Sequence, residues 1–285
     1  MKKDIILNVD KQDYLLSYLK DNVVSKSKNN LKTLLKKGNV FVNGNKTFKH
    51  DLLLSKNDQV LIKLNKTKIE SHQSDIDILY EDDNLIAINK PSGLLTISEK
   101  DDVKSAFSLV QEHLKKINKN NKLYSIHRLD KDTSGIVMFS KNIESKKSYQ
   151  TNWSDIVVKR NYIAVCEKGN INKGRLEHLI NEDNNKVQIT KDNKKGKLAV
   201  TEYKVLRKTK EFMILDIEIL TGRKNQIRAQ MSHIGFPIIG DSKYGGKHFK
   251  KMLLHANELI FKDPFNKNIV KIESKTPSYF HEVIK

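Results

Sequence analysis

The sequence predicts an α+β protein with a mixed, mostly antiparallel sheet, preceded by a small basic module of two helices and a β-hairpin. Two observations predict this fold class. Runs of β-branched or alternating apolar residues outnumber segments with helical spacing, and from about residue 75 they follow one another along the chain. Strands that arrive in consecutive runs favour antiparallel pairing over the regular strand and helix alternation of a parallel sheet.

The first 70 residues predict the small module. Apolar residues recur at helical spacing in two segments, first Tyr14, Leu15, Tyr18 and Leu19, and then Leu31, Leu34 and Leu35. Gly38 is well placed to end the second helix. The segment NVFVNGN that follows alternates apolar and polar residues up to Asn43-Gly44, a pair that favours a tight hairpin turn.

Positive charge is concentrated in this module. The chain has 53 Lys and Arg residues against 34 Asp and Glu, a formal charge of +19, and residues 1–70 hold 15 lysines against 7 acidic residues. Lys28, Lys32 and Lys36 fall on one face of the second predicted helix. This stripe can bind the phosphates of a polyanion, or it can be a solvated face that balances the apolar one. A lysine-rich composition bias is the alternative explanation of the overall excess.

The remainder of the chain predicts one larger domain. Ile227, Met231 and Ile234 share one face of a helix that Gly235 ends. The expected elements, in chain order, are strands at 76–80 and 85–88, a helix at 105–117, a strand at 136–140, a helix at 142–151, strands at 162–166, 198–206 and 212–220, a helix at 227–234, and strands at 253–261 and 269–274.

The segment HRLDKDTSG at 127–135 places two aspartates two residues apart before a glycine, as in the first half of a calcium loop. The twelfth position of such a loop needs a bidentate glutamate, and it is Lys141 here. The flank IVMFS at 136–140 also suits a strand, whereas a calcium loop continues into a helix. We therefore expect no metal ion at this segment.

The composition also bears on the compartment. There is no apolar run near 18 residues, and no apolar segment follows the lysine-rich start, so neither a membrane span nor a signal peptide is indicated. The only cysteine is Cys166, inside the strand-like YIAVC, which excludes an intramolecular disulfide and fits a reducing environment. We expect a cytoplasmic protein.

Six segments give the chain a strong family resemblance. They resemble, in order, the motifs of the RluA-type RNA pseudouridine synthases over about residues 75–285. The segments are KPSGLL at 90–95, HRLDKDTSGIVMFSKN from 127, RNYIAV at 160–165, TGRKNQIR at 221–228, IGDSKYG at 239–245 and LLHANEL at 253–259. The resemblance implies a pseudouridine synthase fold, and isomerisation of uridine in RNA without metal or other cofactor.

The resemblance also implies the catalytic residues. By position, Asp130 matches the catalytic aspartate, Tyr162 the active-site tyrosine, and Arg228 the arginine that pairs with the aspartate. An adjacent guanidinium favours the ionised carboxylate against the effect of burial, and a tyrosine can stack on the detached uracil and take part in proton transfer. Asp132 is then a turn residue or a solvent-facing neighbour.

Three further residues of this domain are candidates for binding the RNA substrate. Arg128 can fill the stack that a flipped nucleotide leaves, hold a flanking phosphate, or pair locally. Arg223 and Ile227 belong to the TGRKNQIR segment. In the same segment, Asn225 stands where many members of the family have histidine.

The basic module has a resemblance of its own. The stretch SKSKNNLKTLLKKGNVFVNG, within about residues 10–65, resembles a small RNA-binding module named after a small-subunit ribosomal protein and shared by bacterial tyrosyl-tRNA synthetases. We therefore expect an RNA-binding module at 1–70 and a catalytic domain at 75–285. The expected partner is structured RNA, large-subunit ribosomal RNA first and transfer RNA as the alternative. The rival hypothesis is a non-catalytic RNA-binding or ribosome-assembly factor with the same fold.

Overall fold

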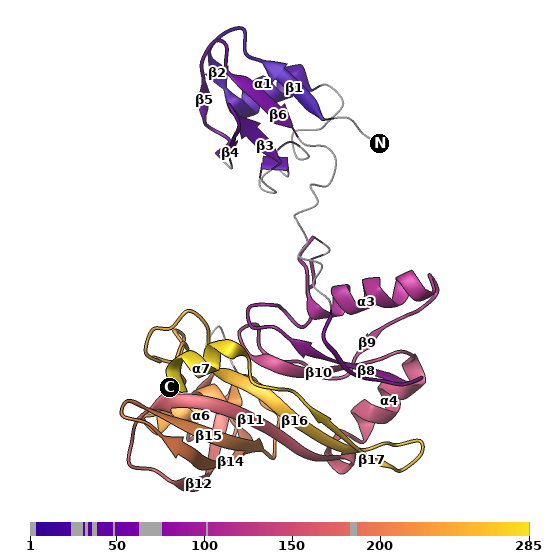
Figure 1. The fold of residues 1–285 in the computed structure, drawn as a ribbon, viewed down its shortest axis with the longest axis vertical. Helices are drawn as coiled ribbons and strands as arrows, with labels where there is room; N and C mark the ends of the chain where they lie inside the picture. Colours follow the sequence, from indigo (N-terminus) through magenta and orange to yellow (C-terminus); the bar gives the residue numbers. More distant parts are fainter. Residues whose placement is uncertain are drawn as a thin grey trace. The chain divides into compact units, whose positions relative to one another are not determined.

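The chain forms two compact units, Met1–Asp75 and Ile76–Lys285 (Figure 1). The computed structural model describes residues 4–23, 31, 34–35, 39–47, 49–62, 76–100, 102–182 and 187–284.

The first unit is built around a small antiparallel sheet. Its strand order is β1-β6-β3-β4, with bounds Ile5–Asn8 for β1, Gln59–Ile62 for β6, Val40–Val42 for β3 and Asn45–Thr47 for β4. A second strand pair and one helix complete the described part, namely β2 (Asp13–Tyr14), β5 (Leu53–Leu54) and α1 (Leu15–Asn22). Apolar residues from all these layers share one core, which includes Leu15, Leu19, Val40, Leu54 and Ile62.

The hairpin expected for NVFVNGN is present. Strands β3 and β4 pair antiparallel across Asn43 and Gly44, whose φ angles are 49° and 78°. Positive φ at both central residues is the geometry that favours Asn-Gly in two-residue hairpins. The helix expected around Tyr18 is also confirmed, as α1.

The expected arrangement of this unit as helix, helix and hairpin is nevertheless wrong. The unit is mainly a small β region, because β1 and β6 pair along their whole lengths, from Ile5 opposite Ile62 to Asn8 opposite Gln59. Strands of four residues contain too few alternations to be recognised from their pattern alone. Their pairing also joins the two ends of the unit, which no local pattern reveals.

The second predicted helix of this unit is only partly described. Leu31 and Leu35 are buried in the core of the unit. Lys28, Lys32 and Lys36 lie outside the described residues, so the lysine stripe stays a prediction.

The second unit contains one large sheet, as the sequence predicted. Eleven strands join it, nine in the order β13-β12-β14-β15-β11-β16-β10-β8-β7, with β17 beside β16 and β9 beside β10. The bounds are β7 Ile78–Glu81, β8 Leu85–Lys90, β9 Tyr124–Ser125, β10 Ser134–Ser140, β11 Val157–Glu167, β12 Lys173–Asn181, β13 Gln188–Thr190, β14 Lys197–Lys208, β15 Phe212–Ile219, β16 Leu254–Lys262 and β17 Ile269–Glu273.

The sheet is mixed because β10 and β16 pair in parallel, while the other described strand pairs are antiparallel. In this parallel pair Gly135 lies opposite Ala256. Gly135 has a φ of 112°, and a Cβ added to it would lie 2.2 Å from the backbone oxygen of Ala256. Only glycine allows this close approach of the two strands.

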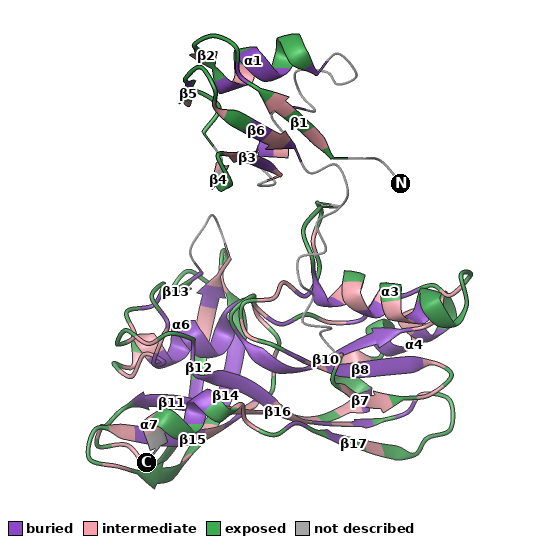
Figure 2. Cartoon of the chain, turned by 45° about the horizontal axis from the view of Figure 1, so that its top comes forward, coloured by how far each residue is buried: buried purple, intermediate pink, exposed green. Residues whose placement is uncertain are grey.

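Helices cover both faces of the sheet around β8 and β10. The helices of this unit are α3 (Ala106–Ile117), α4 (Ile143–Thr151), α5 (Trp153–Ile156), α6 (Gln226–His233) and α7 (Ser278–Ile284). On one face of these two strands, side chains that include Ile86 and Val137 pack on α3. On the opposite face, side chains that include Leu85 and Met138 pack on Tyr149 of α4. This explains why β10 is buried at all seven positions, as Figure 2 shows.

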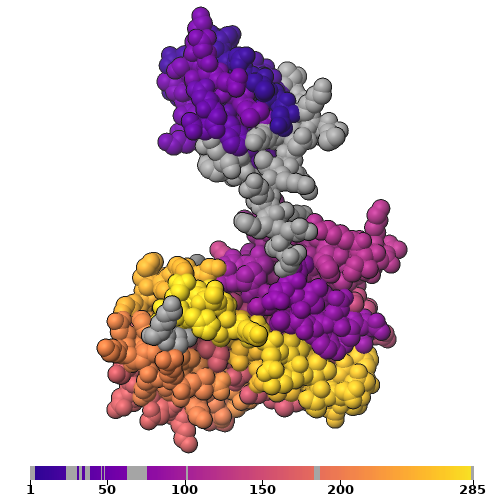
Figure 3. All heavy atoms as spheres, viewed as in Figure 1, coloured from indigo at the N-terminus to yellow at the C-terminus, as the bar shows by residue number. Residues whose placement is uncertain are grey.

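The end of the chain closes the unit. Strand β17 contacts β7, so residues near the C-terminus lie beside the residues that begin the unit (Figure 3). In the sheet order, β16 lies between β11 and β10. The two strands that flank the site described below are therefore joined by a strand from the end of the sequence.

Candidate active site

The loop that carries Asp130 is held by the KPSGLL segment and by Thr96, the residue that follows it. Thr96 Oγ1 donates to the carbonyl oxygen of Leu129 at 2.7 Å and accepts from its backbone N–H at 3.1 Å. On the other side of Asp130, Lys90 Nζ donates to the carbonyl oxygen of Lys131 at 3.0 Å. Asp130 is thus flanked by two fixed peptide groups, and its carboxylate has a defined position.

Lys90 is a buried cation at the end of β8. Its ammonium group also donates to the carbonyl oxygens of Pro91 at 3.1 Å and Leu94 at 2.8 Å, so three backbone acceptors surround it. Burial lowers its pKa to about 8, against the opposing effect of Asp132 and Asp130. The residue ties the KPSGLL segment to the aspartate loop.

Arg228 reaches Asp130 from a segment far along the chain. Its Nη1 donates to Asp130 Oδ2 at 3.2 Å, across 98 residues of sequence, and to Asn225 Oδ1 at 3.0 Å. Its Nε and Nη2 donate to the two carboxylate oxygens of Asp241 at 2.7 and 2.8 Å. The guanidinium side chain is only 9% exposed, and that of Asp241 is fully buried.

This double pairing fixes the charge of the arginine. Burial acts to lower the pKa of Arg228, but the hydrogen bonds and charge of Asp241, together with the charge of Asp130, raise it. The bidentate contact to Asp241 also sets the plane of the guanidinium, so that Nη1 alone faces Asp130.

Asn225 and Tyr244 complete the surroundings of the arginine. Asn225 begins α6 with a left-handed φ of 51°, and its Nδ2 donates to the Tyr244 hydroxyl at 3.2 Å. That hydroxyl donates in turn to the carbonyl oxygen of Val187 at 3.0 Å. The Tyr244 ring lies 5.1 Å from Arg228 Cζ. Asn225 therefore positions Arg228.

Tyr162 lies on β11, opposite Ala256 of β16 and Ile217 of β15. Burial raises its pKa to about 12, with a further contribution from the negative charge of Asp130 and an opposing one from Arg160. The phenol is therefore neutral near pH 7, which makes it a hydrogen-bond donor.

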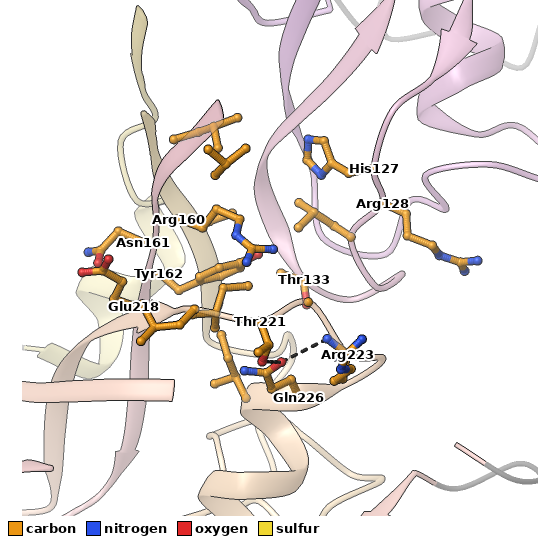
Figure 4. A pocket seen from close by; sticks show the side chains of 18 of the residues that line it. His127, Arg128, Thr133, Arg160, Asn161, Tyr162, Glu218, Thr221, Arg223 and Gln226 are labelled. Carbon is orange, nitrogen blue, oxygen red and sulfur yellow. Dashed lines mark hydrogen bonds between the residues drawn. The ribbon is translucent and has the colours of Figure 1, made fainter. Parts of the chain in front are cut away.

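Asp130, Tyr162 and Arg228 line one pocket of about 880 Å³. The pocket extends from these three residues to His127 and Trp153, whose ring centroids lie 5.1 Å apart. Figure 4 shows Tyr162 in this pocket together with Arg160 and His127. Burial first, and the charge of Arg160 second, lower the pKa of His127 to about 4. Its Nε2 accepts a hydrogen bond from the backbone N–H of Met138 at 3.1 Å, as a neutral imidazole can.

The other predicted substrate-binding residues of this unit also line the pocket. Arg128 is exposed and points away from Tyr162 in Figure 4. Arg223 donates through Nε to the carbonyl oxygen of Leu198 at 2.9 Å. Ile227 is buried and packs in the core with residues that include Met231. Their roles stay predictions.

Asp241 and Arg160 are among the residues of the site that were not predicted from the sequence. Asp241 lies within IGDSKYG, but an acidic residue in a turn-rich segment gives no local sign that it will be buried against an arginine. Arg160 stands two residues before Tyr162, and alternation along a strand would have placed both side chains on one face.

Neither a metal-binding cluster nor a membrane-spanning helix occurs among the described residues. No group of three or more His, Cys, Asp and Glu side chains in them could hold a metal ion. Among the helices formed by those residues, none is long and apolar enough to cross a membrane.

Comparison with known proteins agrees with the family resemblance of the sequence. Residues 84–233 match the family model described as RNA pseudouridylate synthase. An uncharacterized RNA pseudouridine synthase of Mycoplasma genitalium is 32% identical over 282 residues, 93% of this chain and 88% of that protein. The ribosomal large subunit pseudouridine synthase D of Borreliella burgdorferi is 37% identical over 240 residues, 75% of this chain and 72% of that protein.

The fold agrees as well. The structure of human RNA Pseudouridylate Synthase Domain Containing 4 covers 73% of this chain and 91% of that one, with a TM-score of 0.62 and 24% sequence identity. The family model and the relatives confirm the family resemblance drawn from the six segments. The chain belongs to the RNA pseudouridylate synthase family, and it is an RNA pseudouridine synthase, an isomerase.

Proposed function

We propose that Asp130 is the carboxylate that acts on the ribose of a target uridine, while Arg228 pairs with it and orients it and Tyr162 holds the base. The contact that supports this most directly is the 3.2 Å hydrogen bond from Arg228 Nη1 to Asp130 Oδ2 at the wall of the pocket. A guanidinium at this distance pairs with the carboxylate and fixes its direction at the pocket wall.

The reaction replaces one bond to C1′ of the ribose with another. The bond from N1 to C1′ breaks, the uracil turns, and C5 bonds to C1′. The proton lost from C5 is matched by one gained at N1, so no cofactor is consumed. Asp130 can attack C1′ or take a proton from the sugar, and each use requires an ionised carboxylate.

Tyr162 keeps the detached uracil in place. Its ring forms part of the pocket wall, and its neutral hydroxyl can donate to a uracil oxygen while the base turns. A base that escaped to water would leave an abasic site, so retention of the base is part of the chemistry.

The target is a uridine in structured RNA, and large-subunit ribosomal RNA is the substrate that we propose. The relatives from Borreliella burgdorferi and Rickettsia bellii are named ribosomal large subunit pseudouridine synthases. The formal charge of +19 suits a polyanionic partner. Because a paired uridine is inaccessible, the nucleotide has to leave its stack to enter the pocket.

In this proposal, each of the two parts of the chain has its own function. Residues 75–285 form the catalytic domain, and residues 1–70 form a module that binds RNA through phosphate contacts. The support for the module is its excess of lysine and its resemblance to a known RNA-binding module.

The test is a map of pseudouridine across cellular RNA, with and without the gene. We expect one or a few pseudouridines to disappear from large-subunit ribosomal RNA and to return with the wild-type gene but not with Asp130→Ala. A loss confined to transfer RNA would contradict the proposed substrate. Restoration by Asp130→Ala would contradict the proposed role of the carboxylate.

A further inference from the structure

Arg160 faces the pocket from the same strand as Tyr162. The two residues are two positions apart on β11, so both side chains lie on one face of the strand. Asn161 between them lies on the other face, where its Nδ2 donates to the carboxylate of Asp216. Figure 4 shows the Arg160 side chain directed into the same space as Tyr162.

The guanidinium of Arg160 makes no hydrogen bond or ion pair with any residue that the structure describes, although the side chain is half-buried. Two other cations of the pocket do have such contacts. Lys159 pairs with Glu258 at 2.7 Å, and Arg228 is held by Asp241. Burial lowers the pKa of Arg160, although arginine keeps its charge at every physiological pH.

Gly222 makes room for this guanidinium. A Cβ built on Gly222 would lie 2.9 Å from Arg160 Nη1, which is closer than two such atoms approach in real proteins. The absence of a side chain at Gly222 therefore lets the guanidinium lie against the backbone after β15. The guanidinium of Arg160 thus lies between the strand that carries the residue and this glycine.

A half-buried charge without a partner is unfavourable until an anion arrives. RNA brings one negative charge per nucleotide, and the planar fork of arginine matches two phosphate oxygens. Arg228 cannot serve this purpose, because Asp241, Asn225 and Asp130 already occupy its donors. We propose that Arg160 binds a phosphate of the RNA strand that carries the target uridine, inside the pocket and next to Tyr162.

That the strand in the pocket is the RNA with the target uridine rests on the proposed function. Phosphate binding by Arg160, however, is independent of catalysis, because it needs no ionised Asp130. A single-stranded uridylate decamer is therefore a suitable probe. Trp153 is the only tryptophan of the chain and lines the same pocket, so its fluorescence can report binding.

The first experiment measures decamer affinity over a range of salt concentrations. We expect Arg160→Gln to weaken binding by about tenfold and to reduce the slope of log K against log salt by about 0.7, the value for one phosphate contact on a single strand. Arg207→Gln is the matched control, because it removes the same charge from an exposed residue of β14 that does not line the pocket. Equal slopes for the two variants would overturn the proposal.

Gly222→Ala tests the position of the guanidinium at constant charge. The new methyl group has to displace Arg160 Nη1, so we expect weaker decamer binding with a melting temperature within a few degrees of the wild type. Because the contacted atom is the end of a flexible side chain, the fold can absorb the change. Wild-type affinity in this variant would show that decamer binding does not depend on where the Arg160 guanidinium lies, and would count against the proposal.

Enzyme kinetics can separate a phosphate contact from a catalytic one. The substrate is the RNA in which the pseudouridine map locates the target. A phosphate contact predicts that Arg160→Gln raises KM about tenfold and leaves kcat within about threefold. A fall in kcat at unchanged KM would show that Arg160 acts on the detached uracil, and would overturn the assignment. If the proposed function is wrong, Asp130→Ala remains active. The decamer measurements still report whether Arg160 binds a phosphate.

Discussion

Three residues of the candidate active site illustrate what sequence can and cannot reveal. Asp130, Tyr162 and Arg228 were predicted from family resemblance, and the structure brings them to one pocket. Local pattern alone would not have joined Asp130 to Arg228, because 98 residues separate them. The bidentate partner Asp241 was not predicted at all, since its burial depends on the packing of a turn against α6.

Removal of the Asp130 carboxylate should abolish the reaction and spare binding. We expect Asp130→Ala to lose detectable isomerisation, while its RNA affinity stays within a few-fold, because most of the binding free energy comes from phosphate contacts. The measurements are pseudouridine formation and RNA affinity on the same preparation. Undiminished isomerisation would rule out the mechanism.

Asp241 should matter for stability as well as for activity. Asp241→Asn leaves a buried guanidinium without its bidentate acceptor, so we expect the free energy of unfolding to fall by about 3 kcal/mol or more. Asp132→Asn, an exposed neighbour of the aspartate loop, should change it by less than about 0.5 kcal/mol. Urea unfolding of both variants checks this, and equal stabilities would contradict a structural role for Asp241.

His127 should make the fold sensitive to acid. Its pKa is lowered from 6.5 to about 4 in the fold, so the unfolded chain binds more protons than the folded chain between these values. Stability therefore falls as the pH drops from 6.5 to 4, because protonation at Nε2 would break the hydrogen bond from Met138.

The measurement for this prediction is the melting temperature as a function of pH. His127→Asn should flatten the decline between pH 6.5 and 4 relative to the wild type. His248→Asn is the control, since that histidine is exposed and should leave the decline unchanged. A steeper decline of the melting temperature in His127→Asn than in the wild type would contradict the prediction.

At the scale of elements, regular patterns were predicted well and short ones poorly. Strands β8 and β10 and helix α3 have clear apolar signals and form where expected. Strand β12 (KGRLEHLIN) carries charge at alternate positions and was missed, and β1 and β6 are only four residues long. Such strands owe their stability to partners far along the chain, so their own residues reveal little.

The parallel pair β10 and β16 gives a prediction at this scale. Gly135→Ala combines a positive φ with a clash against Ala256, so we expect the free energy of unfolding to fall by more than about 3 kcal/mol. Gly93→Ala also has a positive φ, of 89°, but no atom lies within 4 Å of its added Cβ. It should cost about 1 to 2 kcal/mol, the strain of the backbone alone.

Urea unfolding of the two glycine variants separates strain from crowding. A Gly135→Ala variant no less stable than Gly93→Ala would show that β10 and β16 can move apart without cost. In that case the close approach of the two strands would not be a requirement of the fold.

At the scale of the whole molecule, charge was readable from the sequence, whereas its placement was not. The sequence shows an excess of lysine in residues 1–70, but the three lysines of the predicted stripe lie outside the described residues. The contribution of this unit to RNA binding is therefore a question for measurement.

Deletion of residues 1–70 supplies that measurement. We expect weaker RNA binding and a shallower dependence of log K on log salt, because fewer phosphates would be neutralised. The affinity of the full chain and of the shortened chain for structured RNA, each at several salt concentrations, gives the two slopes. An unchanged slope would identify the lysines as a solvated face.

The position of β16 between β10 and β11 has a consequence for chains that end early. Asp130 precedes β10 and Tyr162 lies on β11, yet the strand that seats them side by side is translated only at Leu254–Lys262. A nonsense codon after residue 75 and before that strand leaves the basic N-terminal residues intact and the candidate active site unassembled. If those residues bind RNA as proposed, such a fragment would occupy its target without converting it, and would act as a competitor of the intact enzyme.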